Sequence, residues 1–174
     1  AGALARVKSR FEWVGVDVVS GTIFFNRLAA IYKPVIKADT ILISPNAGPS
    51  TFAGKKCHPN FFVTSYQNNQ NFEALGKYAQ DNGIKRVFML APNYQAGRDS
   101  MNGFKKHLQG EIADEVFTPL GHKDFSAQIA QIATSKADAV FPFMPGGMGV
   151  SFVKQFDAAG CLAKMTVLSA VLAA

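Results

Sequence analysis

The sequence predicts an α/β protein in which parallel strands alternate with covering helices. After residue 60, short apolar runs typical of strands recur at regular intervals. Between these runs, apolar residues are spaced three and four apart, which is the spacing of a buried helical face. Because strands that alternate with helices form parallel sheets covered on both faces, we expect three layers, with helices on either side of each sheet.

The second part of the chain, residues 67–174, is expected to form one lobe with about four strands. The strand-like runs are residues 87–91, 115–118, 139–143 (interrupted by Pro142) and 165–168. The expected helical faces are Phe72, Leu75 and Ala79; Met101, Phe104 and Leu108; Ile129, Ile132 and Ala133; and Val153 with Phe156. Asp124 is placed to cap the third helix, and glycines after the helical faces suit left-handed caps.

The first part of the chain, residues 1–66, follows the same pattern and is expected to form part of a first lobe. Its strands are expected at residues 16–19, 40–44 and 61–65, with a helix at 28–37 that is bent or broken near Pro34. Residues 1–14 resemble a basic helix or a tail. The polar run at residues 67–71 marks the change of lobe.

Composition and charge exclude several classes of protein. The chain has 174 residues, of which 48% are hydrophobic and 17% charged, so disorder is not expected. The net charge is +6, but the basic residues are scattered, which argues against a nucleic-acid partner. No signal peptide or membrane-spanning run is visible, so either the protein is cytoplasmic or a targeting segment has been removed.

No catalytic or metal-binding constellation is apparent. Cys57 and Cys161 fit neither a redox motif nor a zinc site, and on the lobe assignment they lie in different lobes, which argues against a disulfide. The histidines, His58, His107 and His122, are expected at the surface, with His107 in the middle of a helix. A nucleophile elbow is absent. We therefore expect no enzyme, no metal and no cofactor.

Two glycine-rich segments depart from the nucleotide-binding motifs that they resemble. Five residues separate Gly48 from Gly54, whereas a phosphate loop has four, and Lys55 is not followed by Ser or Thr. The segment of residues 146–149 lacks the third glycine of a dinucleotide fingerprint, because Phe152 stands there. A flexible turn at this helix start can still offer backbone N–H groups to an anion.

Small polar residues follow the strands at the end of the sheets where ligands bind in open α/β folds. Four loops share this character: residues 21–22 with 25–26, residues 46–50, residues 92–95 and residues 145–147. They supply hydrogen bonds, close backbone approach and aromatic walls, but no nucleophile or base. Each loop alone is also explained by good turn formers. Together they indicate a binding site.

A family resemblance agrees with this interpretation. The segments ILISPNAGPS, CHPNFFVTSYQNNQ, KRVFMLAPNYQAGRDSMNGFK, KDFSAQIAQI and ADAVFPFMPGGMG together resemble the type I periplasmic binding proteins of ABC importers. They are similar in particular to the branched-chain amino acid (Leu/Ile/Val) branch, which includes binders of aromatic acids and amides. The resemblance runs from about Val16 to about Leu168.

The resemblance implies two Rossmann-like lobes joined by hinge strands, with residues 61–67 as the first crossing, which close on a small-molecule ligand. It also implies delivery to ABC permease membrane subunits, and a periplasmic or lipid-anchored extracytoplasmic location. By position, the ligand contacts are expected from Phe25, Asn26, Asn46, Ala47, Gly48, Ser50, Tyr94, Gln95, Met144 and Gly146.

Departures from the family pattern bear on the ligand. Phe25 stands where a small hydroxyl residue is commoner, and Ala96 precedes Gly97 where the family often has Tyr. The ligand is therefore expected to be a small carboxylate, an amino acid or a flatter aromatic acid. Two alternatives stay open: a ligand-sensing domain of the same fold in a receptor or regulator, and an α/β enzyme.

The chain is shorter than the family pattern, so we expect a fragment with an incomplete first lobe. Such a fragment would leave apolar edges and faces uncovered. Self-association or weakened ligand binding is expected for the isolated chain. A monodisperse monomer with micromolar or tighter ligand affinity would contradict this.

Overall fold

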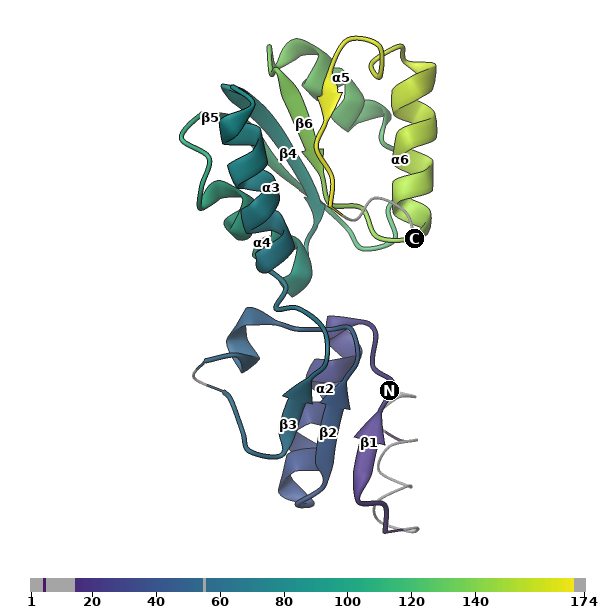
Figure 1. The fold of residues 1–174 in the computed structure, drawn as a ribbon. Helices are drawn as coiled ribbons and strands as arrows, with labels where there is room; N and C mark the ends of the chain where they lie inside the picture. Colours follow the sequence, from purple (N-terminus) through teal and green to yellow (C-terminus); the bar gives the residue numbers. More distant parts are fainter. Residues whose placement is uncertain (1–4, 6–14, 55, 171–174) are drawn as a thin grey trace. The chain divides into compact units, whose positions relative to one another are not determined.

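The computed structural model describes residue 5, residues 15–54 and residues 56–170. The chain divides into two compact units, Ala1–Asn68 and Asn69–Ala174 (Figure 1). The helix or tail expected at residues 1–14 falls outside the described residues, except for residue 5. Among the described residues, none of the helices combines the length and apolar character needed to cross a bilayer.

The first unit contains a three-stranded parallel sheet in the order β1-β2-β3. Its strands are β1 (Val18–Ser20), β2 (Ile41–Ser44) and β3 (Phe61–Val63). Helix α2 (Phe25–Lys37) buries Leu28, Ile31 and Val35 in one cluster with Leu42 of β2. Because neighbouring residues of a strand point to opposite faces, Val18 and Phe62 lie on the other face, where both are exposed.

Helix α2 differs from its expected form in two ways. It begins at Phe25 instead of residue 28, and Pro34 lies inside it without ending it. Proline removes one backbone donor, but the carbonyl of Pro34 still accepts a hydrogen bond from the N–H of Ala38 at 3.2 Å. Of the expected bend or break near Pro34, the break is therefore wrong.

A short 3-10 turn completes the core of the first unit. This turn, η1 (Ser50–Phe52), places the Phe52 ring against Tyr32, with centroids 4.1 Å apart. The ring of Phe61 meets both rings edge-on. Aromatic contacts of this kind, together with the apolar face of α2, hold the loop after β2 onto the sheet.

The second unit contains a four-stranded parallel sheet in the order β5-β4-β6-β7. Its strands are β4 (Arg86–Pro92), β5 (Glu111–Thr118), β6 (Ala139–Pro142) and β7 (Thr166–Val167). Its helices are α3 (Gln70–Asp81), α4 (Gln95–Lys105), α5 (Ser126–Thr134) and α6 (Gly147–Ala158). Both sheets are parallel and alternate with helices, so the predicted α/β fold class is confirmed.

Helices cover both faces of the second sheet, with α3 and α4 on one side and α5 and α6 on the other (Figure 1). Alternate residues of β4 enter different cores: Val87, Met89 and Ala91 pack with α3 and α4, whereas Phe88 and Leu90 pack with α5 and α6. The three layers expected from the sequence are present in this unit.

Several boundaries in the second unit differ from expectation. Strand β5 begins at Glu111, four residues before the predicted start at residue 115, and β7 is only two residues long. The N-cap position of α5 is Phe125, one residue after Asp124. The Asp124 carboxylate nevertheless accepts hydrogen bonds from the hydroxyl and N–H of Ser126, and these bonds lower the pKa of the Asp124 carboxyl.

Candidate functional site

The loops after β1 and β2 are tied together at the carboxyl end of the first sheet. Thr22 donates to the hydroxyl of Ser44 at 3.3 Å, and Ser44 donates to the carbonyl of Ala47 at 2.7 Å. The Asn46 amide donates to the carbonyl of Ile23 at 3.0 Å. These bonds bring the predicted site residues Asn46 and Ala47 beside the loop that follows β1.

Gly48 approaches neighbouring backbone too closely for any other residue. A Cβ at this position would lie 2.2 Å from the carbonyl oxygen of Tyr66. The Gly48 N–H donates to the side chain of Asn68 at 3.2 Å, and its carbonyl accepts from the Asn68 N–H at 2.7 Å. The amide expected to face a ligand carboxylate therefore has an internal acceptor. Ser50 is half-buried at the start of η1.

Phe25 and Asn26 lie in the first turn of α2 instead of the loop in which they were expected. The half-buried Phe25 ring stacks on Phe52, with centroids 6.3 Å apart. Asn26 is exposed, and its side-chain oxygen accepts from the N–H of Arg27. Phe25 thus joins the aromatic cluster of the first unit.

In the second unit, Tyr94 and Gln95 follow β4 at the start of α4. Tyr94 is the N-cap residue, and its ring stacks on Phe143 with centroids 6.3 Å apart and an interplanar angle of 18°. The Gln95 amide donates to the carboxylate of the buried Asp99 at 2.8 Å. Burial raises the pKa of Tyr94 to about 12.

Met144 and Gly146, the predicted residues after β6, take different places. The Met144 side chain is fully buried in the cluster with Phe88 and Leu90, so it belongs to the core and forms no exposed wall. Gly146 is exposed and has a φ of 60°, a conformation that favours glycine. With Gly147, it leaves the first N–H groups of α6 near solvent, where such groups can receive an anion.

Sequence reasoning did not identify Phe143 and Thr118 as site candidates. Phe143 was assigned to a strand, but it lies just beyond the end of β6, beside Tyr94. Thr118 ends β5 with 2% of its surface exposed, and its hydroxyl has no hydrogen-bond partner among the described residues. A polar residue at the carboxyl end of a strand is the signal that could have found Thr118.

The three histidines differ from one another in environment. His107 is exposed and follows the end of α4 instead of lying mid-helix. His58 is half-buried, with its ring accepting from the N–H of Asn60. His122 is also half-buried and meets the Phe125 ring edge-on. All three therefore reach the surface, but only His107 is fully exposed.

Both cysteines are free: Cys57 is exposed in the first unit and Cys161 is half-buried in the second. Within residues 15–54 and 56–170, no group of His, Cys, Asp and Glu side chains could hold a metal ion.

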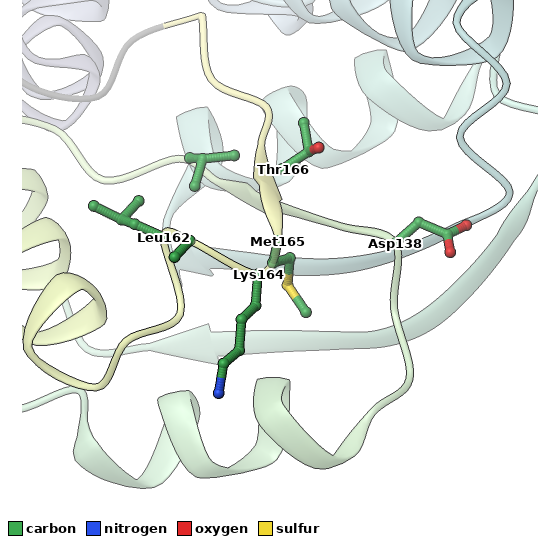
Figure 2. Close-up of a pocket in the computed structure, with 7 residues that line it drawn as sticks. Asp138, Leu162, Lys164, Met165 and Thr166 are labelled. Carbon is green, nitrogen blue, oxygen red and sulfur yellow. The ribbon is translucent and has the colours of Figure 1, made fainter.

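An open hollow of about 520 Å³ lies at the other end of the second sheet. It is lined by Asp138, directly before β6, and by residues 162–167, the last two of which form β7 (Figure 2). The Asp138 carboxylate already accepts from the N–H groups of Lys85 and Arg86. Because ligands in open α/β sheets bind at the carboxyl ends of the strands, this hollow is not the candidate site.

The Tyr94→Phe variant is expected to lose less stability than the wild-type protein as the pH rises above 10.0. The Tyr94 pKa of about 12 lies above the ordinary value of 10.0, so between these pH values only the unfolded state releases the phenol proton. The resulting stabilisation is complete below pH 10.0 and is lost as the pH rises to about 12.

Denaturant unfolding on either side of pH 10.0 measures this effect. The Tyr32 pKa is also raised, so some pH dependence remains in the variant. Tyr78→Phe, at an exposed residue, serves as the control for removing a tyrosine hydroxyl outside the core. If the free energy of unfolding of Tyr94→Phe fell with pH as steeply as that of the wild-type protein, Tyr94 would not stay protonated in the folded state.

The model of the periplasmic binding protein family matches residues 1–174. The chain belongs to this family. This periplasmic binding protein is 30% identical over 137 residues to the Leu/Ile/Val-binding protein homolog 6 of Brucella abortus (strain 2308), in an alignment covering 76% of this chain and 34% of the relative. Membership confirms the predicted family, which is a family of binding proteins.

Solved structures share the fold of this periplasmic binding protein. A solute-binding protein of an ABC transporter from R. palustris in complex with benzoate is 28% identical, with a TM-score of 0.88 over 95% of this chain and 46% of that chain. Another solute-binding protein, from Rhodopseudomonas palustris BisB5 in complex with 3,4-dihydroxy benzoic acid, is 29% identical. Its TM-score is 0.86, and the match covers 96% of this chain and 46% of that chain. LivJ from Streptococcus pneumoniae, in complex with isoleucine, is 20% identical, with a TM-score of 0.83; the match covers 96% of this chain and 47% of that chain. At this identity, the likeness shows a shared fold alone.

This periplasmic binding protein spans about half the length of these solved chains and about a third of the curated relative.

Proposed function

We propose that the protein is an extracytoplasmic solute-binding protein of an ABC importer and that its ligand is a small aromatic carboxylate. It would deliver this ligand to the membrane subunits of a permease from the periplasm or from a lipid anchor. Support comes from family membership and from the two solute-binding proteins at 28% and 29% identity that hold benzoate and 3,4-dihydroxy benzoic acid.

The observation that carries the proposal is the stacked pair of Tyr94 and Phe143. Tyr94 follows β4 and Phe143 follows β6, two strands that are neighbours in the sheet. Their rings are nearly parallel, with an interplanar angle of 18°. A flat apolar wall at the carboxyl ends of the strands suits a planar aromatic ring, because ring pairs stabilise one another by stacking or edge contacts.

The charge of the candidate loops supports an aromatic acid over an amino acid. Residues 21–26, 46–52, 92–96 and 143–147 contain no Asp or Glu. The ammonium group of an α-amino acid is costly to desolvate without an opposite charge or several acceptors, whereas a benzoate carries no ammonium group. Its carboxylate needs donors, which the first N–H groups of α6 can supply within the second unit.

Isothermal titration calorimetry with benzoate, 4-hydroxybenzoate and leucine tests the proposal. We expect one of the aromatic acids to bind about tenfold or more tightly than leucine, a difference of about 1.4 kcal/mol. The unfolding midpoint should rise with the concentration of the same acid, because a ligand that binds only the folded state stabilises it.

Two outcomes would contradict different parts of the proposal. Tighter binding of leucine would overturn the aromatic ligand while leaving a small-carboxylate binder. Carboxylate binding by this chain would be contradicted if none of the three compounds gave heat or a shift of the unfolding midpoint. The concentrations should extend to about the millimolar range, where even weak binding is detectable.

A further inference from the structure

Phe143 occupies a fixed position at the boundary between the core and the ligand end of the second unit. It comes directly after β6, and its N–H donates to the carbonyl of Leu90 at 2.9 Å, which continues the pairing of β6 with β4. Only 7% of Phe143 is exposed, and it packs in the cluster formed with α3 and α4. Its backbone and its ring are therefore both held by regular structure.

The ring of Phe143 has a partner on each side. It meets Phe72 of α3 edge-on, with centroids 5.3 Å apart and an angle of 83°, and stacks on Tyr94 at 6.3 Å. Phe72 in turn meets the ring of Phe141 edge-on at 5.9 Å, and Phe141 stacks on Phe104 at 4.5 Å. Phe143 thus links the Tyr94 ring to an aromatic row inside the core.

The backbone of Tyr94 is fixed independently of its ring. Its N–H donates to the carbonyl of Pro92 at 2.9 Å, and its carbonyl accepts from the N–H of Arg98 at 3.1 Å. Helix α4 also packs tightly on the end of β4, because a Cβ at Gly97 would lie 2.1 Å from the carbonyl oxygen of Pro92. Rotation of the Tyr94 side chain is the remaining freedom, and within the described residues Phe143 is the one aromatic ring that contacts it.

We propose that Phe143 is a positioning residue that holds the Tyr94 ring flat at the ligand end of the second unit and thereby sets the preference for planar aromatic acids over aliphatic ones. This inference rests on the proposed function. A Tyr94 ring backed by Phe143 presents a preformed plane, so a benzoate-type ligand need not order the side chain on binding. An aliphatic ligand gains little from a plane, so its affinity depends less on Phe143.

The test compares Phe143→Leu with wild-type protein. Leucine keeps apolar bulk but removes the ring, and a lost aromatic pair corresponds to about a two- to tenfold weaker interaction. We expect benzoate affinity to fall by this factor while leucine affinity stays within about twofold, measured by calorimetry. Phe143→Tyr, which keeps the ring, should restore most of the benzoate affinity. Ring-labelled tyrosine NMR should show the Tyr94 signals moving toward those of the exposed Tyr78 in Phe143→Leu only.

Phe141→Leu is the matched control. Phe141 also contacts Phe72 and is fully buried, but it has no ring contact with Tyr94. It should lower stability without changing the Tyr94 signals or the ratio of benzoate to leucine affinity. An unchanged ratio and unchanged Tyr94 signals in Phe143→Leu would overturn the inference, as would equal changes in Phe141→Leu. If wild-type protein binds no aromatic acid, the proposed function and the selectivity role both fail, while the NMR signals still decide whether Phe143 orients Tyr94.

Discussion

Replacing Phe104 with alanine is expected to lower the free energy of unfolding of the second unit by about 3–5 kcal/mol, the range for removing a buried aromatic ring. Phe104 is fully buried in α4 and stacks on Phe141 with centroids 4.5 Å apart. The site has little room to collapse, because α3 already lies against the backbone of Phe104: a Cβ at Gly76 would be 2.1 Å from the Phe104 carbonyl oxygen. The cavity should therefore persist and add to the lost burial.

Denaturant unfolding followed by amide hydrogen exchange in β4 measures this change within the second unit. Tyr78→Ala, at a residue of α3 with 56% exposure, should change stability by about 0.5 kcal/mol or less. A loss below about 1 kcal/mol in Phe104→Ala would be too small for a persistent cavity at this position.

Gly97→Ala is expected to destabilise the second unit by about 2 kcal/mol or more, although alanine is the better helix former. The added methyl would lie 2.1 Å from the Pro92 carbonyl oxygen, which belongs to backbone at the end of β4. Since a backbone atom cannot rotate away as a side chain can, α4 must shift from the sheet. The shift should also displace Tyr94, so benzoate binding should weaken together with stability.

Gly147→Ala is the control for Gly97→Ala, because both glycines lie in the first turn of a helix. A Cβ at Gly147 would meet no atom within 4 Å, so this substitution should be neutral or stabilising by up to about 1 kcal/mol. Equal stability of the two variants in denaturant unfolding would show that the close approach of α4 to β4 relaxes without cost.

The buried strands were the part of the fold most readily predicted from sequence. Residues 87–91 form an unbroken apolar run, as expected for a strand covered on both faces, and β4 has this environment. Edge strand β5 was harder to recognise, because its first residues, 111–114, mix charged and apolar side chains and pair with β4 through tertiary contacts. The start of α2 was missed because its N-cap residue, Phe24, makes no side-chain cap.

For the candidate site, the sequence predicted the loops but not the face of the sheet on which each side chain lies. Residues 143 and 144 are neighbours in an extended segment, so their side chains point to opposite faces of the sheet. The sequence does not reveal which face carries which residue. In the structure, Phe143 packs with α3 and α4 beside Tyr94, and Met144 packs with α5 and α6. The internal acceptor for the Gly48 N–H was also invisible, because Asn68 lies 20 residues away.

The placement of the two free cysteines supplies one labelling site in each unit. The chain has two cysteines, and Cys57 lies in the first unit while Cys161 lies in the second. A thiol-reactive environment-sensitive dye on either cysteine would therefore report on one unit without any substitution in that unit. The emission of each dye, recorded as benzoate is added, would show which unit responds to the ligand.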